Sequence, residues 1–97
     1  MRESFYYMYA LGDPRDGEIF YVGRTRNLVQ RWTAHMSAWS WLKARNPAYA
    51  DRMFELRRAG VEPVLVVLEW TADSMRESHF IQKLGGAYAL ANIRQAA

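Results

Sequence analysis

One carboxylate near the C-terminal end of the chain shares a helical stripe with apolar residues. Phe80, Ile81 and Leu84 lie three, four and seven positions beyond Glu77, so all four side chains fall on one face of a helix. Ser74 to Glu77 also has the pattern of a capping box, in which the carboxylate accepts a hydrogen bond from the backbone N–H of the serine. The pattern therefore leaves two roles for Glu77 equally open, a local cap and a carboxylate with a chemical task.

Two further groups of polar side chains could belong to a chemical site. Arg31 and His35 are four positions apart and lie on one helical face, where a snorkelling role beside the core is favoured by the local pattern. Tyr7, Tyr9 and Tyr21 fall in two strand-like segments and could project their phenols to one face. The local pattern favours sheet aromatics for these three tyrosines.

The distribution of charge indicates a polyanion partner more strongly than the net charge of +3 does. Charged residues make up 24% of the chain, yet no Asp or Glu occurs from Ile19 to Ala50. This pattern favours a phosphate-binding surface over a solvated helix face. The basic residues in the window are Arg24, Arg26, Arg31, Lys43 and Arg45.

The composition excludes several kinds of site. The chain has no cysteine, which rules out a disulfide framework, a thiolate zinc site, iron–sulfur ligation and a cysteine nucleophile. The two histidines, at positions 35 and 79, are too few for a histidine-rich metal site. Any metal would therefore need carboxylate ligands and water, which is the ligand set of a hard cation.

The length of 97 residues predicts a single domain spanning residues 1–97 with one core, to which the 14% aromatic residues contribute much of the buried area. The longest apolar run, Val64–Leu68, is far shorter than the roughly 20 residues that cross a bilayer. The N-terminal residues also lack the apolar segment and cleavage site of a secretory signal. We expect an intracellular, cytoplasmic protein with no membrane partner.

The elements that must position these side chains begin with a β-hairpin over residues 5–23. Its strands, Phe5–Leu11 and Glu18–Gly23, flank a cluster of turn residues. A helix follows from Asn27 as N-cap, with an apolar stripe that continues to Trp39.

The second half of the chain predicts two more helices and one strand. Pro47 suits the first position of a helix that follows Asn46 and ends near Ala59, before Gly60. The apolar stripe of this helix consists of Tyr49, Met53, Leu56 and Ala59. The continuous aliphatic run Val64–Leu68 is typical of a strand covered on both faces, so we expect it to be central. Ser74–Leu84 is the last helix. The predicted class is α/β, a small three-stranded sheet of hairpin plus central strand flanked by helices, in the order ββααβα.

Taken together, these residues closely resemble the GIY-YIG nuclease domain family, over nearly the whole chain from Tyr6 to Ile93. The family's first triplet reads Tyr7-Met8-Tyr9 here and its second reads Tyr21-Val22-Gly23, so that its first Gly is replaced by Tyr7 and its second Ile by Val22. Neither replacement removes a chemical group of the family's site. The remaining matching segments are Asn27-Leu28, Arg31-Trp32 with His35, Arg76-Glu77 with Phe80-Ile81, and Ala91-Asn92-Ile93.

The resemblance implies a metal-dependent endonuclease that hydrolyses DNA phosphodiester bonds. By similarity to the family, Glu77 holds a single Mg²⁺ or Mn²⁺, and Arg31 clamps the scissile phosphate. Tyr9 would orient or deprotonate the attacking water, with Tyr21 and His35 holding the water and the phosphate.

Other residues would support the site or bind the nucleic acid. Asn92 would orient the site, and Gly23 would allow the backbone to approach the substrate. The residues expected to contact DNA are Gly23, Arg24, Arg26, Lys43 and Arg45. The chain has no room for an additional DNA-reading module, so specificity for duplex or branched DNA would come from a homodimer or from a fused or associated recognition module.

Two other functions remain open at this point. The chain could be a catalytically silent nucleic-acid-binding module of the same fold, which keeps the basic face for another task. It could also be an interaction domain that docks a partner through exposed Trp39 and Trp41.

Overall fold

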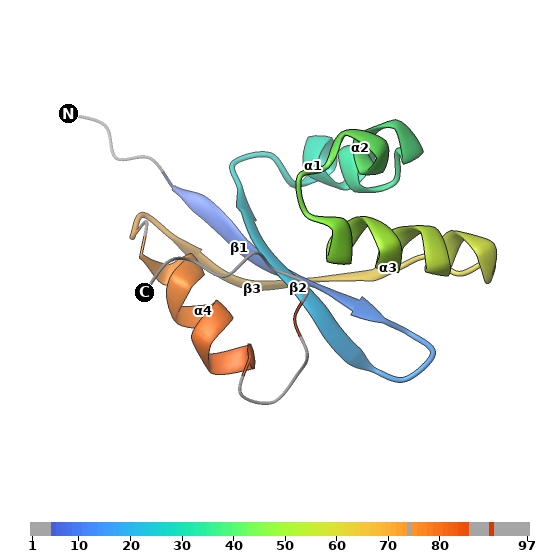
Figure 1. Cartoon of the computed structure of the whole chain (residues 1–97). Helices are drawn as coiled ribbons and strands as arrows, with labels where there is room; N and C mark the ends of the chain where they lie inside the picture. The colour runs from blue at the N-terminus through green and yellow to red at the C-terminus, as the bar shows by residue number, and fades with distance from the viewer. Residues whose placement is uncertain (1–4, 74, 86–89, 91–97) are drawn as a thin grey trace.

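The computed structural model describes residues 5–73, 75–85 and 90. It confirms the α/β class and the three-stranded sheet, and Figure 1 shows α1, α2 and α3 grouped on one side of the strands with α4 apart from them. The order of the elements in this part of the chain is ββαααβα. Their bounds are β1 Tyr6–Asp13, β2 Glu18–Thr25, α1 Leu28–His35, α2 Ala38–Lys43, α3 Pro47–Arg58, β3 Val64–Thr71 and α4 Arg76–Gly85.

The predicted hairpin is formed by β1 and β2, which pair antiparallel. Gly17 closes the turn with φ of 75°, a left-handed conformation that favours glycine. Leu11 pairs with Tyr21 and Gly12 pairs with Ile19, so Phe20 is the extra residue of a β-bulge. Phe20 belongs to the buried core and Tyr21 packs against it. The bulge thus lets two successive aromatic residues contact the same cluster.

The strand order corrects the predicted place of the aliphatic run. The sheet has the order β2-β1-β3, so β1 is central and β3 is an edge strand. Val64, Val66 and Val67 are each between 45% and 48% exposed. The run satisfies the β-branched preference of a strand, but this preference does not distinguish an edge from a centre.

The expected helix from Asn27 to Trp39 is in fact two helices, which is why the predicted order ββααβα lacked one element. Asn27 does cap α1, since its side chain accepts from the N–H of Gln30. The chain then turns at Ser37, whose extended backbone begins α2. The turn buries Trp41, which is 3% exposed and donates its indole N–H to the carbonyl of His35 at 2.6 Å. Trp39 is 66% exposed, so the prediction of two exposed tryptophans was wrong for Trp41.

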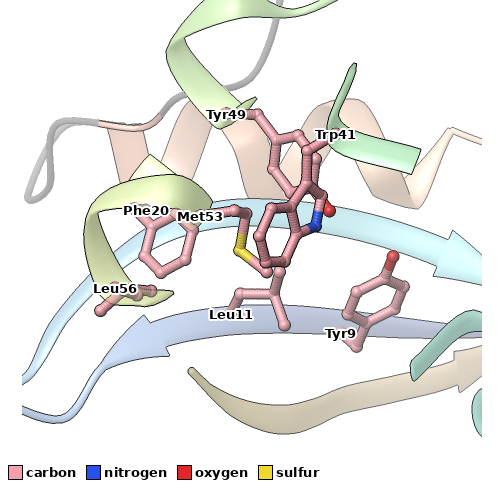
Figure 2. Close-up of a cluster of buried hydrophobic side chains, with 7 residues drawn as sticks. All are labelled: Tyr9, Leu11, Phe20, Trp41, Tyr49, Met53 and Leu56. Atoms are coloured by element: carbon pink, nitrogen blue, oxygen red, sulfur yellow. The ribbon is translucent and has the colours of Figure 1, made fainter. Parts of the chain in front are cut away.

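The core lies between β1, β2 and the group of helices α2 and α3. Its members, labelled in Figure 2, are Tyr9, Leu11, Phe20, Trp41, Tyr49, Met53 and Leu56. Helix α3 has the expected ends, with Asn46 as a side-chain N-cap, Pro47 in the first turn, and Gly60 beyond it at φ of 72°. Within the described residues, no helix combines the length and the apolar character needed to cross a bilayer.

A buried carboxylate ties the tip of the hairpin to α3. Asp13 is 1% exposed and accepts hydrogen bonds from the Arg15 guanidinium, with Nη2 to Oδ2 at 2.7 Å. The same Arg15 Nη2 donates to Glu55 of α3 at 2.7 Å, and Nε of Arg52 lies 3.6 Å from Asp13. The hydrogen bond from Arg15 holds the pKa of Asp13 below its usual range. These charges fix the hairpin against the helix.

Replacing Asp13 by Asn removes the charge and keeps the shape, and we expect it to destabilise the domain by about 2 kcal/mol at neutral pH. A depressed carboxylate pKa contributes stability above the unfolded pKa, and this contribution is lost as the pH falls through the folded pKa. The difference between wild type and variant in urea unfolding should therefore shrink on acidification below pH ~4. Asp16→Asn, at an exposed turn position, is the control; a difference for Asp13→Asn that does not change with pH would contradict the assignment.

Candidate functional site

A cavity of about 400 Å³ gathers most of the candidate catalytic residues in one place. Its walls come from β2, α1, α4 and the segment that runs from α2 into α3. Four of the five residues predicted to be catalytic line it, which are Tyr21, Arg31, His35 and Glu77. Arg45 and Tyr49 line it as well.

Tyr9, the fifth predicted residue, lies directly behind this wall. Its side chain is fully buried at the centre of the sheet, and Figure 2 shows its hydroxyl pointing away from β1, toward the side of the cluster where Trp41 and Tyr49 lie. The hydroxyl oxygen is 2.7 Å from Nε2 of His35 and accepts a hydrogen bond from Nε of Arg31 at 3.1 Å. Burial raises the pKa of Tyr9 to about 12, although the bond from Arg31 opposes this shift. Tyr9 thus joins Arg31 and His35 of α1 to the sheet.

Gly23 makes this position of Tyr9 possible. It is the cross-strand partner of Tyr9 in the hairpin. A Cβ atom at residue 23 would lie 2.5 Å from the Tyr9 hydroxyl oxygen and 2.6 Å from the ring carbon that bears it. The phenol therefore fills the space that a side chain at position 23 would need. The approach of a substrate to the backbone at Gly23 stays a prediction, and in the structure the ring of Tyr9 occupies the space beside this glycine.

His35 is held by two phenols. It is 3% exposed, with Nε2 bonded to the Tyr9 hydroxyl and Nδ1 2.5 Å from the hydroxyl of Tyr49. Burial lowers the pKa of His35 to about 4, and the positive charge of Arg31 acts in the same direction. His35 is therefore a neutral imidazole at neutral pH, so one ring nitrogen donates and the other accepts.

Tyr49 was assigned to the core stripe of α3 by its spacing and was missed as a site residue. It is 8% exposed, packs its ring 4.9 Å from that of Tyr21, and bonds His35. No local pattern separates it from Met53 or Leu56 of the same stripe. Only the packing of α3 against α1 reveals its contact with the histidine.

Arg31 supplies a permanent positive charge at the cavity wall. It is partly exposed, with Nε engaged by Tyr9. Burial alone would lower its pKa, but the hydrogen bond and charge interaction with Tyr9 and Tyr21 hold the pKa above its ordinary value. This arginine stays charged whatever occupies the cavity.

Glu77, in the first turn of α4, is the one carboxylate among the described residues that line the cavity. Its side chain is 31% exposed and lies 3.9 Å from Nε of Arg24. In the part of the chain that the structure describes, no group of three His, Cys, Asp or Glu could hold a metal ion. A cation here would thus be held by one carboxylate, and the open cavity leaves room for water and phosphate oxygens, which fits a hard cation. Ser74, the other member of the predicted capping box, lies outside the described residues.

The predicted DNA-contacting residues fall into two groups. The guanidinium groups of Arg24 and Arg26 lie 5.0 Å and 4.9 Å from the ring centre of Tyr6. On α2 and just after it, Lys43 lies over the ring of Trp39 and Arg45 lines the cavity. Asn92 lies outside the described residues.

Comparison with known proteins bears on this arrangement. The family model for the GIY-YIG catalytic domain matches residues 5–87. The chain belongs to the GIY-YIG family. Searches of curated proteins and of solved structures gave no match. The two triplets of this GIY-YIG domain lie side by side, with Tyr9 paired to Gly23 across β1 and β2. Family membership places the domain in a nuclease family.

Gly23→Ala tests the packing of Tyr9 directly. We expect a loss of about 1–3 kcal/mol of stability, since the new methyl group overlaps a fully buried ring. Gly12→Ala on β1 is the matched control, because a Cβ there would meet its nearest atom at 3.6 Å, an ordinary contact. Urea unfolding compares the two; equal stability of both variants would show that the ring of Tyr9 can move aside.

Proposed function

We propose that this GIY-YIG domain is a DNA endonuclease that hydrolyses phosphodiester bonds with one divalent cation, Mg²⁺ or Mn²⁺. The observation that carries the proposal is the convergence of Glu77, Arg31 and Tyr21 on one cavity from α4, α1 and β2. Phosphodiester hydrolysis needs a group that neutralises phosphoryl charge, a group that handles water and help for the leaving oxygen. Each need has a candidate in the cavity.

Arg31 is the group for the phosphoryl charge. Its planar guanidinium is pinned through Nε by Tyr9, which fixes its orientation before substrate arrives. A pre-oriented positive charge stabilises the charge that develops in the transition state without reorganising during the reaction. Arg45, on the same cavity wall, adds positive charge for the DNA backbone.

Tyr21 is the phenol best placed to meet the attacking water. The family resemblance assigns the attacking water to Tyr9. The side chain of Tyr9 has no exposed surface, however, whereas Tyr21 lines the cavity. We therefore assign Tyr21 to the water and Tyr9 to the positioning of Arg31 and His35. His35, neutral at neutral pH, acts in this proposal by orienting its neighbours and not by donating a charge.

Glu77 would hold the cation, with water and a phosphate oxygen as the other ligands. When bound, Mg²⁺ or Mn²⁺ supplies Lewis-acid stabilisation of the phosphoryl and leaving oxygens. The partial exposure of Glu77 keeps it accessible from solvent, and the positive charge of the neighbouring Arg24 favours the approach of a phosphate. The two groups of basic residues would bind the DNA backbone, and a second copy of the chain or an associated module would supply sequence specificity.

Glu77→Gln tests the metal-dependent reaction. We expect the variant to fold and to bind duplex DNA, but to nick plasmid DNA at least about 100-fold more slowly in Mg²⁺ or Mn²⁺. The control is Glu62→Gln, which changes an exposed carboxylate that does not line this cavity. Nicking by Glu77→Gln at the wild-type rate would remove the metal site, and DNA binding without any nicking by wild type would identify a silent binding module.

Arg31→Lys tests the role of the guanidinium. Lysine keeps the charge but has one nitrogen, which cannot hold Tyr9 and clamp a phosphate with the geometry of the fork. We expect cleavage to fall about 100-fold while DNA affinity changes far less, because the lost contact acts mainly in the transition state. Arg58→Lys, at an exposed position on α3, is the control, and equal losses of affinity and rate would mean that Arg31 only binds.

A further inference from the structure

A chain of four polar side chains runs through the wall of the cavity. It starts at Arg31, passes through the hydroxyl of Tyr9 and both ring nitrogens of His35, and ends at the hydroxyl of Tyr49. The successive donor–acceptor distances are 3.1, 2.7 and 2.5 Å. Hydrogen positions along such a chain are fixed by its ends, because each phenol and the neutral imidazole can face either way.

Arg31 sets the direction of donation along this chain of hydrogen bonds, since a guanidinium donates hydrogen bonds and accepts none. Its Nε–H donates to the Tyr9 oxygen, and the Tyr9 side chain is fully buried. If Nε2 of His35 also donated to Tyr9, the Tyr9 O–H would have to find another acceptor in the protein interior, at a substantial cost if it found none. If Tyr9 donates to Nε2 instead, its hydrogen is satisfied. The second arrangement is the favourable one.

The same direction of hydrogen-bond donation continues through His35. With Nε2 accepting, the neutral imidazole carries its hydrogen on Nδ1 and donates it to the oxygen of Tyr49. The Tyr49 hydroxyl hydrogen is thus not used by His35. Tyr49 lines the cavity, so its hydroxyl hydrogen is placed to reach a ligand there, as is the guanidinium of Arg31 at the other end of the chain of hydrogen bonds.

We propose that Tyr49 is a substrate-binding residue whose hydroxyl, oriented by the chain from Arg31 through Tyr9 and His35, donates a hydrogen bond to a phosphate oxygen of the nucleic acid. The inference rests on the proposed function and adds to it a contact from α3. Hydrogen bonds in a chain polarise one another, and this chain begins at a fixed positive charge, so its last donor is strengthened toward an anion. Arg45 on the same wall favours an anion at this place. Burial raises the pKa of Tyr49, which keeps the hydroxyl protonated as a donor.

The first test determines the direction of donation along the chain of hydrogen bonds in the free protein. We would measure by ¹⁵N NMR at neutral pH which ring nitrogen of His35 carries the proton, using His79, which is exposed on α4, as an internal reference. The proposal requires the proton on Nδ1. A proton on Nε2 would mean that Tyr49 donates to His35, and would overturn the proposal whether or not the protein cleaves DNA.

The second test removes the hydroxyl and the phosphate charge in turn. We would measure binding of Tyr49→Phe to a short DNA duplex in EDTA, and to duplexes with single uncharged methylphosphonate linkages placed one position at a time. A hydrogen bond to a charged acceptor predicts affinity about tenfold weaker for the natural duplex. At the contacted linkage, wild type and variant should bind the methylphosphonate duplex alike. Tyr7→Phe, which removes a phenol that does not line the cavity, is the matched control.

The outcomes separate this inference from the proposed function. If wild type cleaves DNA but Tyr49→Phe binds every duplex as wild type does, the contact from Tyr49 is wrong and the nuclease stands. If wild type neither binds nor cleaves the duplex, both the contact from Tyr49 and the proposed nuclease function are wrong. If thermal unfolding shows that Tyr49→Phe does not fold, the position of the His35 proton in the unmodified protein still decides the direction of the chain.

Discussion

The site depends on the insertion of one phenol into a space that only a glycine leaves open. Tyr9 lies against Gly23 of the neighbouring strand, where a Cβ atom would overlap its ring. From that position its hydroxyl holds both Arg31 and His35 of α1. The sheet thereby fixes the arginine and the histidine from behind, and the helix does not have to position them alone. A phenol suits this task because its ring contributes to the core while its oxygen bonds polar groups.

Burial gives the neighbouring groups different electrostatic roles. Tyr9 and Tyr49 stay protonated and His35 stays neutral, since a charge on any of them would be poorly solvated. Arg31, partly exposed and bonded to Tyr9, keeps its charge. At Arg31, the wall of the cavity therefore presents a fixed positive group supported by neutral, hydrogen-bonded residues. Such an arrangement is pre-organised for an anion, because little has to move when a phosphate binds.

The carboxylate is supplied separately, by an element that is apart from the other helices. Glu77 lies in the first turn of α4, which packs on β2, and it meets the rest of the site across the cavity. A single, partly exposed carboxylate leaves most positions around a hard cation to water and substrate oxygens. The charge that opposes Glu77 comes from Arg24 at 3.9 Å, on the strand that also carries Tyr21 and Gly23. Strand β2 thus links the residues for water, metal and DNA in this proposal.

The sequence by itself determined the family, the hairpin, helix α3 with its Asn46 cap, and five of the residues that line the cavity, which are Tyr21, Arg31, His35, Arg45 and Glu77. These features follow from local chemistry, namely turn residues, caps and motif spacing. The tertiary structure alone decided which strand is central, because the β-branched run Val64–Leu68 is compatible with either place in a sheet. It also decided that Trp41 is buried and that Tyr49 reaches His35, since both depend on how α2 and α3 pack on α1. The full burial of Tyr9 and the partial exposure of Tyr21 were also decided by the tertiary structure. One bulge and one glycine place these two similar side chains differently, and no pattern along the sequence predicts that difference.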